Sequence, residues 1–214
     1  MNVPFKAFHT FGKHTKWYLM SKAAATRNHI LENAFKLIYL KGYQATSIDE
    51  IISTTAVTKG AFFYHFKNKE DMGLAIIKEV MYPGMVPHMI EVLGRTEDLI
   101  EDIYNMIKDL LLYNPFFKVE YGCPAVNLID EMAPLNASFR QALMDIMLEW
   151  QTVIEKHLTK AQAEGRINAA AQPKQIALYI TANYSGVRNM GKVLGRASYV
   201  EFLKQFKTYL QTLK

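Results

Sequence analysis

Apolar residues recur at three- and four-residue steps along most of the chain, which is the spacing of helices that bury one face. The first such stripe covers residues 24–41 and stops at Gly42, a residue suited to a helix C-terminus. No alternating strand pattern appears, so the sequence predicts an all-α fold. A helix is predicted at about 69–82, where Pro83 and Gly84 would break or kink it. Further helices are predicted at 97–113, with Thr96 as cap, and at 125–132, 138–164 and 173–194. The last helix is predicted to begin at a capping box formed by Ser198 and Glu201.

Two short helices are predicted between the first long stripe and residue 69. Ser47 and Glu50 have the spacing of a capping box, and Thr58 is placed to cap a second short helix that ends near His65. Residues 55–57 form the turn between the two helices. Two short helices joined by a turn of this length are typical of a helix-turn-helix, which presents its second helix to the DNA major groove.

The charge distribution supports an anionic partner for the N-terminal part of the chain. Residues 1–20 hold three lysines and no acid, residues 21–82 hold eight basic and six acidic residues, and residues 83–214 hold fourteen of each. The whole formal charge of +5 therefore lies in the first 82 residues.

Other classes of protein find little support. Half of the residues are apolar, as in globular proteins, and no apolar run has the length of a membrane span. A single cysteine excludes an intrachain disulfide and favours a reducing compartment, so we expect a cytoplasmic protein without membrane contact. His88 and Glu91 have no third metal ligand nearby, and no catalytic constellation or phosphate loop is recognisable. We expect no enzyme, no metal and no cofactor.

The second short helix has the chemistry of a DNA reader. Between Lys59 and Lys69 there are three lysines and His65, and the first acid is Glu70. Gly60 costs about 1 kcal/mol relative to alanine inside a helix. A close approach to the DNA backbone is one benefit that would offset this cost.

The segment Thr58-Lys-Gly-Ala-Phe-Phe-Tyr-His-Phe-Lys-Asn-Lys-Glu70 resembles the signature of the tetracycline-repressor (TetR) family, and the resemblance extends over residues 26–82. Ile52 and Ala56 replace the usual alanine and turn glycine, and Phe63 stands where tyrosine is common. Position by position, the resemblance implies phosphate contacts from Thr46, Tyr64, His65 and Lys69, base contacts from Thr58, Lys59, Ala61 and Phe63, and core positions for Phe62 and Phe66.

The resemblance also implies an organisation and a function. Residues 21–68 would be the helix-turn-helix domain and residues 69–214 the effector-binding and dimerisation domain. The protein would bind a palindromic double-stranded DNA operator as a homodimer and repress transcription until a small-molecule effector releases it. The competing interpretation from another class is a helical ligand-binding scaffold that does not bind DNA.

Two sets of residues are predicted in the larger domain. The helix over 173–194 carries two packable stripes, and we expect the small-residue stripe to contact a twofold-related subunit. The predicted interface residues are Ala177, Thr181, Tyr184 and Ser185. The residues predicted to line an effector pocket are Met106, Leu110, Tyr113, Phe116, Phe117, Met147 and Trp150, for which ordinary core packing is the alternative.

Cys123 lies in the segment 122–131, which resembles a pattern in a branch of the family that includes electrophile and oxidant sensors. A thiol just before a helix N-terminus can have a lowered pKa, and Lys192 is a nearby lysine that would assist; an inert core thiol is the alternative. Residues 1–20 are unusual for the family. Met20 is a candidate true start, and an arm that enters the DNA minor groove is the other interpretation.

Overall fold

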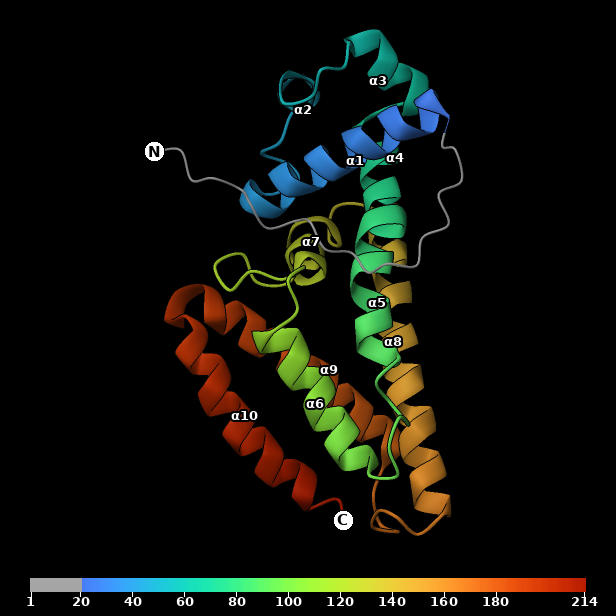
Figure 1. Cartoon of the computed structure of the whole chain (residues 1–214), viewed down its shortest axis with the longest axis vertical. Coiled ribbons are helices and arrows are strands. Elements are labelled where there is room, and N and C mark those ends of the chain that lie inside the picture. Colours follow the sequence, from blue (N-terminus) through green and yellow to red (C-terminus); the bar gives the residue numbers. More distant parts are fainter. Residues whose placement is uncertain (1–20) are drawn as a thin grey trace.

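The computed structural model describes residues 21–214, and the predicted all-α fold is confirmed for that range (Figure 1). Both interpretations of residues 1–20 concern a segment outside the described residues. The only β-type pairing within 21–214 is an isolated bridge between Lys118 and Gly122. The elements are α1 (Lys22–Lys41), α2 (Ile48–Ser53), α3 (Lys59–His65), α4 (Lys69–Ile76), the π-helical segment η1 (Ile77–Met81), α5 (Tyr82–Ile90), α6 (Leu99–Leu112), α7 (Pro124–Met132), α8 (Ala137–Ala163), α9 (Pro173–Leu194) and α10 (Arg196–Gln211).

Helices α1, α2 and α3 form the small domain at one end of the molecule, which we call the reader (Figure 1). The predicted caps are present. The hydroxyl of Ser47 accepts from the backbone N–H of Glu50 at 3.1 Å, and that of Thr58 accepts from Ala61 at 3.2 Å. Each bond satisfies an amide that the first helical turn leaves unpaired. Local capping thus defines where both short helices begin.

Of the two outcomes predicted at Pro83, a break or a kink, the break is wrong, because α4, η1 and α5 form one rod over residues 69–90. Proline normally disrupts a helix because its ring clashes with the carbonyl four residues earlier. Here the turn before Pro83 is π-helical, and the N–H of Tyr82 donates to the carbonyl of Ile77, five residues back. This wider turn accommodates the proline ring, and the rod continues into the second domain.

Two predicted helix starts are also corrected. Helix α6 is capped by Asp98, which accepts from the N–H of Glu101, and not by Thr96. Helix α10 begins at Arg196, before the proposed capping box, and the hydroxyl of Ser198 donates to the carbonyl of Gly195 inside the first turn. Gly195 has a φ of 72°, so it ends α9 and allows α10 to begin at the next residue.

Helices α8 and α9 are the long pair of the second domain, and α10 packs across α6 and α9 (Figure 1). The ring of Trp150 on α8 meets the ring of Tyr184 on α9 edge to face, with 5.1 Å between centroids. The side-chain amide of Gln151 donates to the hydroxyl of Thr181 at 2.9 Å. Among the described helices, none is both long and apolar enough to cross a membrane.

Candidate nucleic-acid interface

Helix α3 has an inward face that packs against the rest of the chain and an outward face that is exposed. Phe62 is fully buried, and Phe66 is buried at the C-cap. Phe63 and Tyr64 point outward, with exposed fractions of 47% and 77%. The predicted core and surface assignments of these four aromatic residues agree with their burial. An exposed tyrosine beside an exposed phenylalanine offers a hydroxyl for a phosphate and an apolar ring for a base.

Lys59 lies at the first turn of α3 and is held by the preceding helix. Its ammonium donates to the carboxylate of Asp49 at 2.9 Å, and both side chains are largely exposed. A surface ion pair of this kind contributes only about 0–1 kcal/mol. Lys59 can therefore exchange Asp49 for an anionic partner at small cost.

Neither the backbone conformation nor a close neighbour requires glycine at position 60. Its φ is not in the left-handed region, and a Cβ there would have the hydroxyl of Thr58 as its nearest neighbour, at 4.0 Å. Glycine at this position therefore gives up helix stability without relieving a clash within the described residues. The missing side chain leaves the backbone open at the exposed start of α3.

The predicted phosphate contact of Thr46 is wrong, whereas that of Lys69 stays a prediction. Thr46 is fully buried and its hydroxyl donates to the carbonyl of Gly42 at 2.7 Å, so it supports the loop before α2 and has no surface for a phosphate. The ammonium of Lys69 lies 4.3 Å from the ring centroid of Tyr43 and donates to the carbonyl of Gln44 at 3.4 Å. Partial burial lowers the pKa of Lys69, and the charge of Glu131 opposes this shift.

The other predicted residues remain near the surface. Thr58 is exposed, although its hydroxyl already caps α3, and Ala61 is half-buried. His65 is also half-buried, with its ring edge-on to that of Tyr64 at 4.9 Å between centroids. Thr58, Lys59, Gly60, Phe63 and Tyr64 therefore form the exposed surface of α3.

Glu131 links the reader to the second domain. No motif in the sequence around Glu131 predicts this contact. Its carboxylate lies on α7 and accepts from the backbone N–H groups of Tyr43 at 2.8 Å and Gln44 at 2.6 Å. These amides follow α1 and precede Thr46 in the chain. The contact spans 88 residues of sequence, so only the folded structure brings its partners together.

Tyr39 makes a second link from α1 to the segment before α7. Its hydroxyl donates to the carbonyl of Gly122 at 2.6 Å and accepts from the N–H of Lys118 at 3.0 Å. Burial is the main cause that raises the pKa of Tyr39, so the phenol stays protonated and keeps its donor.

The small-residue stripe predicted to contact a second subunit faces the interior. Ala177, Thr181 and Tyr184 are each about 1% exposed and pack within one chain, and Ser185 is half-buried with its hydroxyl donating to the carbonyl of Thr181. This burial corrects the assignment of that stripe to a subunit interface. Thr181 and Tyr184 of this stripe contact Gln151 and Trp150 of α8.

The residues predicted to line an effector pocket are scattered between core and surface. Tyr113 is 61% exposed and Met147 is half-buried. Phe116 lines a cavity of about 310 Å³ next to α1. The remaining predicted pocket residues, Met106, Leu110, Phe117 and Trp150, are buried in the core.

Cys123 is the N-cap residue of α7, as the sequence suggested, but its environment differs from the expectation. The residue is 2% exposed, and burial raises the pKa of its thiol, while the Arg188 cation and the backbone amides of α7 oppose this shift. Lys192 donates to the side-chain oxygen of Asn127. The predicted lowering of the Cys123 pKa is therefore wrong. Within residues 21–214, no three side chains of the metal-binding types gather into a possible ion site.

Comparisons with known proteins agree with this geometry. Residues 30–76 match the family model described as "Bacterial regulatory proteins, tetR family", and residues 100–206 match "Tetracyclin repressor-like, C-terminal domain". An uncharacterized HTH-type transcriptional regulator in the lacX 3' region of Lactococcus lactis is 32% identical over 134 residues, which cover 63% of this chain and 68% of the relative.

Two further relatives share the fold across both domains. The HTH-type transcriptional repressor NemR of Escherichia coli is 23% identical over 172 residues, covering 78% of this chain and 84% of NemR, and the crystal structure of its reduced form matches with a TM-score of 0.74. A TetR-family regulator from Cytophaga hutchinsonii is 19% identical, with a TM-score of 0.81 over 91% of this chain and 98% of that one. These matched proteins are transcriptional regulators and not enzymes.

The position of Gly60 predicts that one substitution will raise the stability of the fold and lower the affinity for DNA. Replacing it with alanine, Gly60→Ala, should raise the free energy of unfolding by up to about 1 kcal/mol, because alanine favours the helix and meets no clash. The same change should weaken DNA binding, because the new methyl group occupies the exposed start of α3. Chemical denaturation and DNA titration by fluorescence anisotropy measure the two effects. A variant that is more stable and binds DNA unchanged would contradict the assigned role of Gly60.

Proposed function

Because the chain belongs to the tetR family of bacterial regulatory proteins, we propose that it is a ligand-responsive repressor that binds a palindromic DNA operator as a homodimer. The observation that best supports DNA binding is the exposed outward face of α3. That face exposes Lys59, Phe63 and Tyr64 around a glycine that the chain itself does not require. Two such helices, one per subunit, would enter successive major grooves about one helical turn apart.

Repression and release follow from the position of the reader at the end of the rod formed by α4, η1 and α5. The unliganded dimer would hold both α3 helices at operator spacing. An effector that binds more tightly to a second conformation would shift the dimer away from that spacing and release the DNA. The seven residues predicted for an effector pocket stay a prediction.

DNA binding is tested on a duplex from the promoter region of the protein's own gene. Replacing Lys59 or Tyr64 with alanine should weaken binding roughly tenfold or more, because each change removes a contact worth about 1–3 kcal/mol. If the lost contact is to a phosphate, the salt dependence of binding should also become shallower.

Two exposed residues in the second domain provide matched controls. Lys204→Ala removes a lysine that pairs with Glu201, as Lys59 pairs with Asp49, and Tyr113→Ala removes an exposed tyrosine. Equal DNA affinity for all four variants would favour the helical scaffold that does not bind DNA.

We place the subunit interface on the exposed apolar stripe of α9. Leu178, Met190 and Val193 are 57%, 54% and 85% exposed, and Ala182 and Gly186 lie exposed between them at four-residue spacing. A Cβ on Gly186 would have no neighbour within 4 Å. Large apolar side chains around a small-residue centre allow the same helix of a second subunit to pack closely across a twofold axis. Met144 and Leu148 extend the exposed apolar surface onto α8.

This interface predicts that Ala182→Glu converts the dimer into a monomer. The substitution would place two carboxylates near the twofold axis in a desolvated contact. Sedimentation equilibrium measures the result, and Ala197→Glu, at an exposed position on α10, is the matched control. A dimer that survives Ala182→Glu with unchanged affinity would rule out this face.

The second candidate function is sensing of electrophiles or oxidants through Cys123. The observation in its favour is that Cys123 caps the N-terminus of α7, whose far end carries Glu131 and its bonds to the reader. Adding atoms to a thiol that is 2% exposed would push on α7. Against it, burial raises the pKa of the thiol, so little of the reactive thiolate is present at neutral pH.

N-ethylmaleimide, which alkylates a thiol by addition, is the probe for this alternative. Sensing predicts that treatment lowers DNA affinity of the native protein and leaves Cys123→Ser unaffected. The raised pKa predicts slow labelling that accelerates as the pH rises. Release of DNA by the reagent in both proteins, or in neither, would exclude Cys123 as the sensor.

A further inference from the structure

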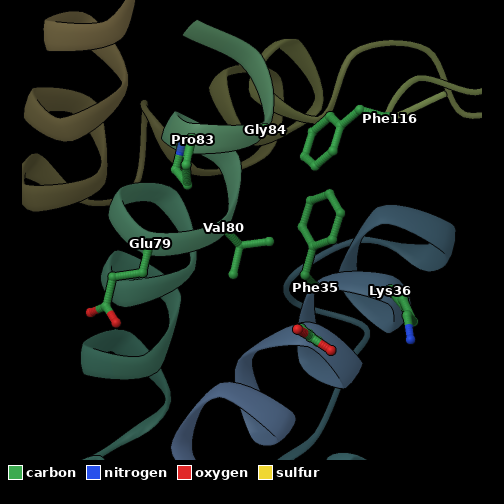
Figure 2. Close-up of a pocket in the computed structure, with 8 residues that line it drawn as sticks. Phe35, Lys36, Glu79, Val80, Pro83, Gly84 and Phe116 are labelled. Carbon is green, nitrogen blue, oxygen red and sulfur yellow. The ribbon is translucent and has the colours of Figure 1, made fainter. Parts of the chain in front are cut away.

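A cavity of about 310 Å³ lies between the reader and the rod that carries it. Helix α1 forms one wall and the junction of η1 with α5 forms the other, so both domains contribute to its lining. Figure 2 shows Val80 pointing from η1 toward the rings of Phe35 and Phe116. The volume is at the lower end of the range for small-molecule sites. None of the contacts assigned to DNA or to the subunit interface uses this cavity.

Two aromatic rings and the side chain of Val80 form the apolar side of the cavity. The rings of Phe35 and Phe116 are stacked, with 5.2 Å between centroids and 18° between planes. Phe116 reaches this position because Gly84 faces it, and a Cβ on Gly84 would lie 2.4 Å from the ring. Val80 lies in the π-helical segment η1, a type of irregularity that is frequent at functional sites.

The charged rim favours a cation. Glu79 stands at one edge, but both its oxygens accept from Arg27, with 2.8 Å between Nη2 and Oε1. Glu32 stands on α1 and is exposed, and within residues 21–214 no ion pair neutralises it. Lys36, also on the rim, has a contact of its own. The lining therefore carries two carboxylates against one ammonium, and Glu32 is the carboxylate that has no ion pair within the described residues.

We propose that this cavity binds a small aromatic organic cation, whose ring packs against Phe35, Phe116 and Val80 and whose charged group lies beside Glu32. We further propose that binding weakens the hold of the protein on DNA, a step that rests on the function proposed above. The ligand would contact the reader itself, because α1 supplies one wall of the site. Ligand binding would then change the position of the reader directly, and no conformational change would have to pass through the second domain.

A chain of three side chains connects the cavity to α3. Arg27 is bound to Glu79 at the rim, and its guanidinium carbon lies 4.9 Å from the ring centroid of Phe66. Phe66 is the C-cap residue of α3 and is 1% exposed. A ligand that occupies the space between α1 and η1 would move Arg27 on α1 away from Glu79 on η1 and so remove the support of Phe66. Helix α3 then loses one of the contacts that set its orientation on the rod.

Two probes with the same aromatic body and opposite charge test the site. They are 1-naphthylmethylammonium and 1-naphthylacetate, titrated calorimetrically into the full-length protein without DNA. The cation should bind at least about tenfold more tightly than the anion. Glu32→Gln should remove most of this preference, and Glu201→Gln, at an exposed acid on α10, should leave it unchanged.

A second pair of variants tests the location. Val80→Trp should fill the cavity and abolish binding of the cation, whereas Val200→Trp, at an exposed position on α10, should not. If Val80→Trp fails to fold, the Glu32→Gln result still decides. Equal affinity for the two probes, or undiminished binding to a folded Val80→Trp, would overturn the proposed site.

The regulatory step has its own readout. Saturating 1-naphthylmethylammonium should lower the affinity for the promoter duplex by about tenfold, and 1-naphthylacetate at the same concentration should not. Binding of the cation with unchanged DNA affinity would overturn the link from the cavity to α3. Since DNA binding without probe is measured separately, a failure of the proposed DNA-binding function is distinguishable from a failure of the cavity proposal.

Discussion

The bond between one carboxylate and two backbone amides fixes how the reader sits on the rest of the molecule. Glu131 reaches from α7 and accepts from Tyr43 and Gln44 just after α1 ends. Its charge makes these bonds stronger than neutral ones, and its loss would leave two amide donors to find other partners. The buried Thr46 and the half-buried Lys69 both contact the loop that this carboxylate holds. The position of the reader therefore depends on a residue of the second domain.

Helix α1 is held to the second domain near both of its ends. Glu131 and Tyr39 hold the C-terminal end, and the Arg27–Glu79 pair holds the N-terminal end. The pair is partly exposed, so solvent competes with it, whereas the hydroxyl bond of Tyr39 is buried. If the Arg27–Glu79 pair is released, α1 would rotate about its C-terminal end, which Glu131 and Tyr39 still hold. Since α3 packs on α1, such a turn would move the outward face of α3.

Local signals predicted the helices well, and packing decided what they could not. Ser47, Thr58 and the outward aromatic residues of α3 were recognisable because caps and periodicity act within a few residues. The continuation of the helix past Pro83 was missed, because it depends on a π-helical turn that the residue types in the segment do not predict. Thr46 and the inward stripe of α9 were misassigned because their burial comes from distant segments. Glu131 had no recognisable role for the same reason.

Glycines inside the helices show how intrachain and external contacts can be separated. A Cβ on Gly73, Gly84 or Gly191 would come within 2.6 Å of an aromatic ring of the chain, so each of these glycines makes room for a neighbour. Gly60 and Gly186 have no such neighbour. A helical glycine without a steric reason is costly, and the proposed DNA and subunit contacts supply a reason at these two sites. One site is on α3 and the other is on the exposed stripe of α9. The sequence does not show which of these glycines make room for a neighbouring ring, because the fold brings those rings in from other elements.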